Sequence, residues 1–221
     1  MINSALSKNI DNQALVVQLE ELLNQRKSNL LKELFLQKSF NQFNKQYLAF
    51  RKKYKDAKWS IQLLRNDQNK SFLDINIRSK REINDQIYNL QTNQTVKLET
   101  YKNKIKGYEV IDEESILNSQ NSPLIINIIS PKKVLTGEKY EMNLIIKSPL
   151  DNSLTASGMI LLKNEDTNKI SNDLFGIKPN QSGGLFKYIQ APLKPGSQII
   201  SAIITHPKGI YLITKKIKVD L

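Results

Sequence analysis

The sequence predicts an α+β protein in which N-terminal amphipathic helices pack on an antiparallel sheet and an all-β sandwich follows. Apolar residues recur at helical spacing between residues 12 and 54. After Lys58 apolar and polar residues alternate with period two, and from residue 124 short strand-like segments fill the chain. With 221 residues, of which 39% are hydrophobic, the chain is long enough to bury one or two cores.

The first helical segment, residues 12–36, carries leucines on one face. An apolar face of this size needs a partner, either within the chain or on another chain. If no partner exists within the chain, we expect self-association or docking to another protein through this helix. The candidate interface residues are Leu15, Leu19, Leu22, Leu23 and Leu30.

The second helical segment, residues 40–54, places aromatic rings at steps of three and four, so that all of them share one stripe. Such a stripe usually packs a helix onto a sheet or onto a second helix, and we favour this interpretation over ligand binding or base stacking. The rings are those of Phe40, Phe43, Tyr47, Phe50 and Tyr54.

Alternation with period two predicts antiparallel strands with one solvated face behind the aromatic helix. We expect breaks at 66–69 and at 79–82. The expected strands cover 59–63, 72–77, 87–92 and 95–101, with 105–111 as an extension. At the level of layers alone, this arrangement is similar to the helix-plus-curved-sheet folds of the cystatin and nuclear-transport-factor-2 kind.

An acidic run followed by Ser, Asn and Pro marks residues 112–122 as the expected linker. We therefore expect an α+β domain at 1–111 and an all-β domain at 123–221. Short strands separated by Gly, Pro and Asn turns predict a two-sheet sandwich in the second domain. These strands cover 124–129, 140–147, 156–162, 169–175, 184–190, 198–205 and 210–219.

Three stretches of the second domain carry a family resemblance: Val134–Tyr140 leading into an apolar strand, Gly184–Pro192, and Pro195–Ile203 followed by a closing strand. They resemble the immunoglobulin-like modules of many bacterial proteins. The resemblance implies a fold and surface loops or edge strands that bind partners, but no activity. The cysteine pair, the buried Trp and the tyrosine corner of antibody-type domains are absent.

Charge permits an anionic partner, because Lys and Arg number 33 against 21 Asp and Glu, for a net charge of +12. Nucleic acid, anionic lipid and acidic proteins all meet this description. The excess is mostly Lys, and the codon bias of an AT-rich genome would also produce it.

The basic residues form two clusters that flank the first predicted strands. Cations at the end of the aromatic helix interact favourably with the helix dipole. They also suit a docking patch in which Tyr54 and Trp59 stack on bases or insert at a membrane interface. The candidate patch comprises Arg51, Lys52, Lys53, Lys55, Lys58, Arg78, Lys80 and Arg81.

Residues for catalysis, metal binding or cofactor binding are scarce. Cysteine is absent, His206 is the only histidine, and residues 181–184 lack the lysine of a phosphate-binding loop. We expect no enzyme activity, no cofactor and no metal site. No secretory signal and no long apolar run appear, so we expect a cytoplasmic protein for which peripheral membrane association stays open.

Three hypotheses for function remain. The leading one is a non-catalytic interaction or scaffold protein. The second is a binder of nucleic acid or an anionic membrane surface through the basic patch. The third is an enzyme that binds a small molecule in the α+β domain, with polar strand residues such as Asp74, Tyr88 and Glu99 lining the pocket.

Overall fold

The computed structural model describes residues 2–67, 70–147, 153–162, 175–180 and 183–221, with side chains from residue 12 onward. The protein is α+β and mostly strand. It divides into two compact units. Unit 1 comprises Met1–Arg81 and Leu90–Ile111, and unit 2 comprises Glu82–Asn89 and Asp112–Leu221.

The helices of unit 1 are α1 (Ile2–Gln25), α2 (Ser28–Leu34) and α3 (Gln37–Lys53). The single helix expected at 12–36 is therefore wrong in two respects: the first helix begins at Ile2, and it ends at Gln25. Arg26 adopts φ 59°, a left-handed conformation that ends helices and is usually taken by Gly. The apolar spacing continues across this break, which is why the sequence pattern did not reveal it.

The predicted aromatic helix is confirmed as α3. Its last turn carries Arg51, Lys52 and Lys53, where cations interact favourably with the helix dipole. The helix ends at Lys53, and the backbone N–H of the C-cap residue Tyr54 donates to the carbonyl of Phe50.

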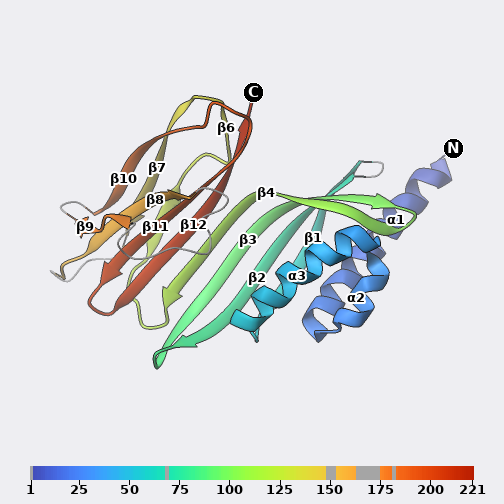
Figure 1. The fold of residues 1–221 in the computed structure, drawn as a ribbon, viewed down its shortest axis with the longest axis horizontal. Coiled ribbons are helices and arrows are strands. Elements are labelled where there is room, and N and C mark those ends of the chain that lie inside the picture. Colours follow the sequence, from blue (N-terminus) through green and yellow to red (C-terminus); the bar gives the residue numbers. More distant parts are fainter. Residues whose placement is uncertain (1, 68–69, 148–152, 163–174, 181–182) are drawn as a thin grey trace. The chain divides into compact units, whose positions relative to one another are not determined.

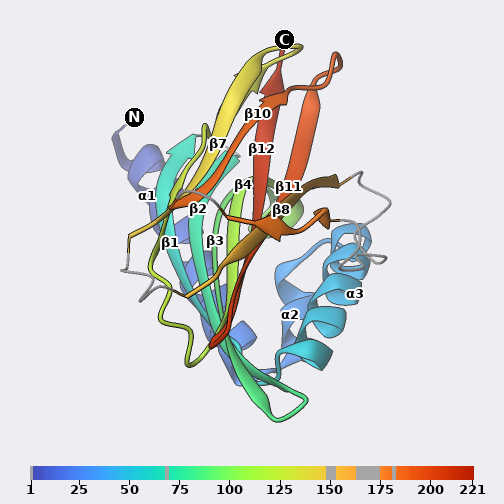
Figure 2. The ribbon, with the colours of Figure 1, turned by 90° about the vertical axis from the view of Figure 1, so that its left-hand side faces the viewer.

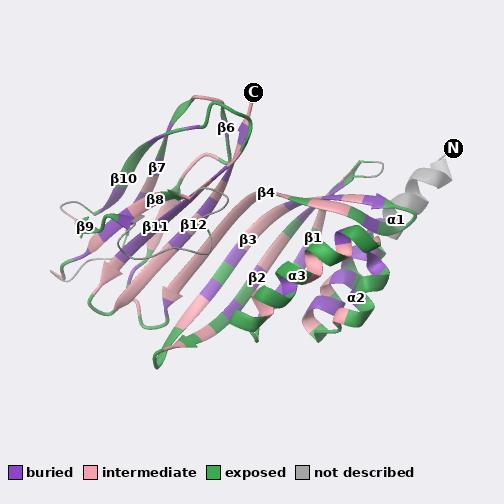
Figure 3. Ribbon diagram, viewed as in Figure 1, coloured by how far each residue is buried: buried purple, intermediate pink, exposed green. Residues whose placement is uncertain are grey.

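The sheet of unit 1 comprises β1 (Lys58–Asp67), β2 (Lys70–Ile83), β3 (Gln86–Tyr101) and β4 (Lys104–Ser119), neighbours in that order. The helices lie along one face of this sheet, as Figures 1 and 2 show from two directions. Buried and less buried residues alternate along the strands (Figure 3). Buried residues of β1 and β2, such as Ile61 and Leu73, share one core with the leucines of α1.

Two predicted strand breaks are wrong. Residues 79–82 lie inside β2, and the segments 87–92 and 95–101 form one strand, β3. The chain instead turns at Asn84–Asp85 and at Lys102–Asn103, with φ between 47° and 62° at all four residues. Such paired positive φ values are typical of two-residue hairpin turns, which commonly contain Gly. Without Gly, these turns have a weak sequence signal.

Residues 112–119, expected to lie in the linker, continue strand β4. The acidic run does not interrupt the strand because it faces lysines: Glu113 is opposite Lys216 of β12, and Glu114 is opposite Lys215. Opposite charges directly across an antiparallel pair stabilise it.

Unit 2 is built from strands in two antiparallel sheets. In one, β4 is followed by β12, β11, β8 and β9, and β6 pairs in parallel with β12. The other has the order β10-β7-β5. Figure 2 shows β10 beside β7. The strands are β5 (Ile126–Ile129), β6 (Lys133–Leu135), β7 (Lys139–Ile146), β8 (Ala156–Leu162), β9 (Lys178–Pro179), β10 (Gly184–Gln190), β11 (Gly196–His206) and β12 (Gly209–Asp220).

The predicted strands of the second half are confirmed wherever the chain is described. The strand expected at 169–175 lies outside the described residues, apart from Phe175. Among the described residues, no helix is long and apolar enough to cross a membrane.

Candidate functional site

The aromatic stripe of α3 packs against the sheet, as the spacing predicted. Phe43 stacks on Phe35, with ring centroids 4.7 Å apart, and on Tyr47, at 5.8 Å. Tyr47 in turn contacts Trp59 of β1 at 5.9 Å. These rings form a continuous layer along α3 and onto β1.

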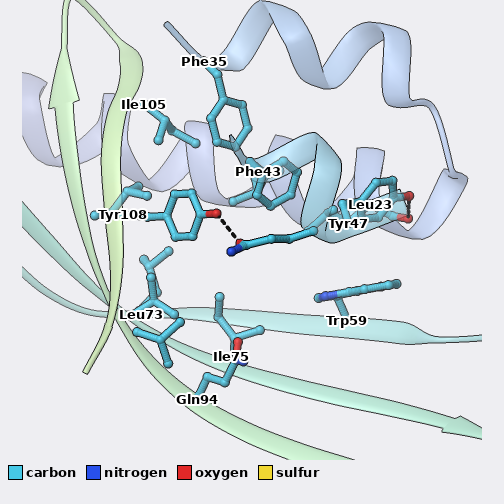
Figure 4. Close-up of a pocket in the computed structure, with 15 residues that line it drawn as sticks. Leu23, Phe35, Phe43, Tyr47, Trp59, Leu73, Ile75, Gln94, Ile105 and Tyr108 are labelled. Atoms are coloured by element: carbon cyan, nitrogen blue, oxygen red, sulfur yellow. Dashed lines mark hydrogen bonds between the residues drawn. The ribbon is translucent and has the colours of Figure 1, made fainter. Parts of the chain in front are cut away.

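A cavity of about 160 Å³ remains between the helices and the sheet of unit 1 (Figure 4). Its deep walls are apolar, and Leu73 of β2 and Ile105 of β4 are both fully buried. The lining residues are Leu19, Leu23, Phe35, Phe43, Gln46, Tyr47, Trp59, Leu73, Ile75, Gln94, Val96, Leu98, Ile105, Tyr108 and Val110.

Polar groups lie toward the open side of the cavity. Gln46 is exposed, whereas Gln94 and Tyr108 are half-buried. The Tyr108 hydroxyl donates a hydrogen bond of 2.6 Å to Oε1 of Gln46, which links β4 to α3 (Figure 4). Burial raises the pKa of Tyr108 above its ordinary value, so its hydroxyl stays protonated at neutral pH.

The chemistry of the lining is limited to hydrogen bonding and apolar contact. The side chains that line the cavity include amides, phenols and an indole, but no carboxylate, imidazole or amine. Such groups orient a bound molecule without transferring protons at neutral pH. In the described parts of the chain, no three His, Cys, Asp or Glu side chains gather where they could hold a metal ion.

The residues suggested for a ligand cup lie elsewhere. Asp74 is exposed, between the buried Leu73 and the half-buried Ile75, and Glu99 pairs with Lys97 at 3.5 Å. The Tyr88 hydroxyl donates to Gln86 near the β2–β3 turn. None of the three lines the cavity. Period two places Asp74 and Glu99 on the face of the sheet opposite the cavity. Tyr88 has the same parity as the lining residues of β3, but it lies in the part of that strand that belongs to unit 2.

Arg51 turns inward, unlike the rest of the candidate basic patch. Its guanidinium donates to the carbonyls of Leu23, Lys55 and Ala57, at 2.5, 3.0 and 2.9 Å, and lies 4.3 Å from the centre of the Trp59 ring. Trp59 is buried, so it offers no exposed ring for stacking or insertion. This arginine holds the end of α1 and the α3–β1 connection together.

Six of the seven other cations of the patch are exposed, Arg81 is half-buried, and some of the seven come together. The pairing of β1 with β2 places Lys58 directly opposite Arg78. Arg81 lies 5.8 Å from the ring of Tyr54, at the end of α3. Within the described residues, no ion pair involves any of these cations. The exposed members are Lys52, Lys53, Lys55, Lys58, Arg78 and Lys80.

The predicted leucine interface is largely occupied by the chain itself. Leu15, Leu19, Leu22 and Leu23 are buried in the core of unit 1, where they pack with residues of the sheet. Leu30 alone of the five stays exposed, on α2. The condition for docking another chain on this face, that no internal partner exists, is therefore not met.

Comparison with known proteins concerns mainly unit 2. Residues 121–220 match a family described as a domain of unknown function (DUF8623), a stretch that runs from before β5 to the last residue of β12. No curated protein matches the chain. This part of the chain is thus similar to DUF8623, and the cavity of unit 1 lies outside the matched residues.

Proposed function

We propose that this is a non-catalytic binding protein whose unit 1 holds a small, predominantly apolar molecule beneath α3. The cavity carries this proposal. Protein interiors are close-packed, and a cavity costs stability because its lining atoms lack contact partners. A ligand that fills the space restores these contacts.

The volume supports a ligand about the size of one substituted ring. Cavities of about 150 Å³ lined by aliphatic and aromatic side chains stay dry and bind molecules such as benzene. The cavity of unit 1, at about 160 Å³, is close to this size, and most of its lining is aliphatic or aromatic, with Gln46 and Gln94 as the amides. The absence of a carboxylate, imidazole or amine among the lining side chains supports binding without catalysis.

Trp59 provides the test, because it lines the cavity and is the only tryptophan in the chain. We expect toluene to change Trp59 fluorescence saturably and to raise the melting temperature of the protein. The variant Ile75→Phe fills the cavity and should abolish both effects.

The matched control is Leu63→Phe. Leu63 lies on β1, in the same core but outside the cavity lining, so its variant should still bind toluene. Circular dichroism verifies that both variants fold. The proposal fails if toluene leaves the wild type unchanged, or if both variants lose the response equally.

For unit 2 we propose an immunoglobulin-like sandwich that presents a surface to a protein partner. Two antiparallel sheets around one aliphatic core support this class. Strand β10 is an edge strand of its sheet, and its residues Phe186 and Tyr188 are 52% and 80% exposed. Exposed rings on an edge strand suit recognition by strand addition.

Unit 1 is proposed, at the level of layers, to belong with the helix-plus-curved-sheet folds.

A second candidate function is binding of nucleic acid or an anionic membrane through the exposed cations of unit 1. The pairing of Lys58 opposite Arg78 favours this candidate. Like charges directly across a strand pair destabilise the pair. An anionic partner would relieve this repulsion.

Binding to duplex DNA and to anionic lipid vesicles, each measured at increasing salt, tests this candidate. Changing Lys52, Lys53, Lys55 and Lys58 together to Gln should abolish binding and flatten the salt dependence. The same change at four exposed lysines of unit 2, Lys132, Lys139, Lys187 and Lys194, is the control for net charge. Equal loss in both variants would show that net charge alone attracts the anion.

A further inference from the structure

We infer that the ligand of unit 1 is neutral and amphipathic, with one hydrogen-bonding group that binds at Gln46 and Tyr108. The inference rests on the proposed function, and it names the chemical class and the orientation of the molecule. Alcohols, phenols and small amides of about one ring belong to this class.

The burial of the lining residues sets the orientation. Leu73 and Ile105 at the deep end are fully buried, whereas Gln46 is the exposed residue of the lining. The Tyr108 hydroxyl of β4 donates to the Gln46 amide of α3, and the dashed line at the Tyr108 hydroxyl in Figure 4 marks this bond. An apolar ring therefore lies deep against the sheet, and its polar substituent lies at this pair.

The pair offers both a donor and an acceptor. Tyr108 uses its single hydrogen in the bond to Gln46 Oε1. The Gln46 amide nitrogen then remains able to donate, and the Tyr108 oxygen remains able to accept. A hydroxyl or an amide on the ligand can engage both atoms, which a purely donating or purely accepting group cannot do.

The lining offers no counter-charge to an ionised ligand end that is drawn into the cavity. A carboxylate or phosphate entering the cavity would lose hydration without meeting a Lys, Arg or His side chain there, and an ammonium would meet no Asp or Glu. Burying an unpaired charge is strongly unfavourable. The cavity therefore selects a neutral polar group.

Three probes that share one ring test the inference: toluene, benzyl alcohol and benzoate. Their affinities are measured from Trp59 fluorescence for the full chain and for Tyr108→Phe. Because a neutral hydrogen bond contributes modestly, we expect the variant to bind benzyl alcohol about five- to tenfold more weakly and toluene within about twofold of wild type. Benzoate should bind neither protein.

Tyr47→Phe is the matched control, since it makes the same chemical change at another lining residue whose hydroxyl donates to the carbonyl of Leu23. It should shift toluene and benzyl alcohol equally. Gln46→Leu, on the exposed side of α3, should repeat the selective loss seen with Tyr108→Phe.

The outcomes separate the two proposals. If toluene binds but Tyr108→Phe and Gln46→Leu weaken both probes equally, or if benzoate binds as well as benzyl alcohol, the inference is overturned and the proposed cavity function stands. If none of the probes binds the wild type, both are overturned. Selective loss of benzyl alcohol in both variants supports the inference.

Discussion

The two units bury apolar residues in different ways: unit 1 packs the rings of a helix on a sheet above an apolar cavity, whereas unit 2 packs strands on strands. The core of unit 1 joins aromatic residues of α3 to a sheet. The core of unit 2 is largely aliphatic and comes from strands, with Met142, Leu144, Ile200 and Ile213 fully buried. Beneath the rings of α3, unit 1 keeps a cavity of about 160 Å³ between helix and sheet.

The units also differ in how they bury a cation. In unit 1, Arg51 is half-buried, donates to backbone carbonyls and packs against Trp59. In unit 2, the Lys215 side chain is 5% exposed and lies between two carboxylates, 3.1 Å from Asp112 Oδ1 and 3.5 Å from Glu114 Oε2. The contact with Asp112 is an ion pair without the angle of a hydrogen bond. A cation in the sequence is therefore no guide to a surface patch until its burial is known.

Removing the buried cation of unit 2 should have the largest effect. Lys215→Ala leaves two neighbouring carboxylates without a counter-charge, which should lower the free energy of unfolding by about 3 kcal/mol. Urea denaturation followed by circular dichroism measures this change. Lys216→Ala, one residue away on the opposite side of β12, should cost less than about 1 kcal/mol. Equal losses would mean that Lys215 is not an essential partner of the acids.

The half-buried cation of unit 1 should show a smaller effect that depends on shape. Arg51→Lys keeps the charge but cannot reach several carbonyls and a ring face at once. We expect a loss of about 2 kcal/mol in the unfolding transition reported by Trp59 fluorescence. Lys52→Gln, at an exposed position, should leave that transition unchanged. If the Arg51→Lys variant is as stable as wild type, the inward contacts of Arg51 do not stabilise unit 1, and Arg51 is better interpreted as a member of the surface patch.

The smallest expected effect is a loss of stability of unit 2 at alkaline pH. Burial raises the pKa of Tyr140 to about 12, and the hydroxyl donates to Gln198 Oε1 at 2.6 Å. In the unfolded chain a tyrosine titrates near pH 10, so the unfolded state loses its proton first. The contribution of Tyr140 to stability is thus complete below about pH 10 and declines as the pH rises toward about 12.

Tyr140→Phe tests this linkage by unfolding measurements across the same pH range. The variant should be somewhat less stable at neutral pH, because Gln198 loses its donor, and should lose less stability between about pH 10 and about pH 12. The slope should not vanish, because burial also raises the pKa of Tyr211. Parallel curves for variant and wild type would contradict the prediction.

The spacing of apolar residues along the sequence predicted the aromatic helix and most of the strands. The 3,4 spacing of rings predicted α3, and period two predicted the strands and the face that each buries. The breaks were harder to predict. Arg26, Asn84 and Lys102 adopt positive φ without being Gly, so the residues that end these elements carry no strong signal.

The candidate site was only partly visible in the sequence. Its apolar lining coincides with faces already expected to be buried, such as Val96 and Leu98 of β3. One signal for its polar side exists: Gln94 falls in the same alternation as these two residues, a polar group on an apolar face. Gln46 precedes Tyr47 on α3 and has no comparable signal.

The sequence by itself determined which residues seek the interior and how often they recur, because side-chain direction in a helix or strand depends only on local backbone geometry. It also determined the excess of positive charge. Tertiary structure decided that the leucine face of α1 packs against the sheet of unit 1, that Arg51 turns inward, and that a cavity remains under the rings of α3. Each of these depends on the distance between elements far apart in the chain, a distance set by the packing of all side chains together.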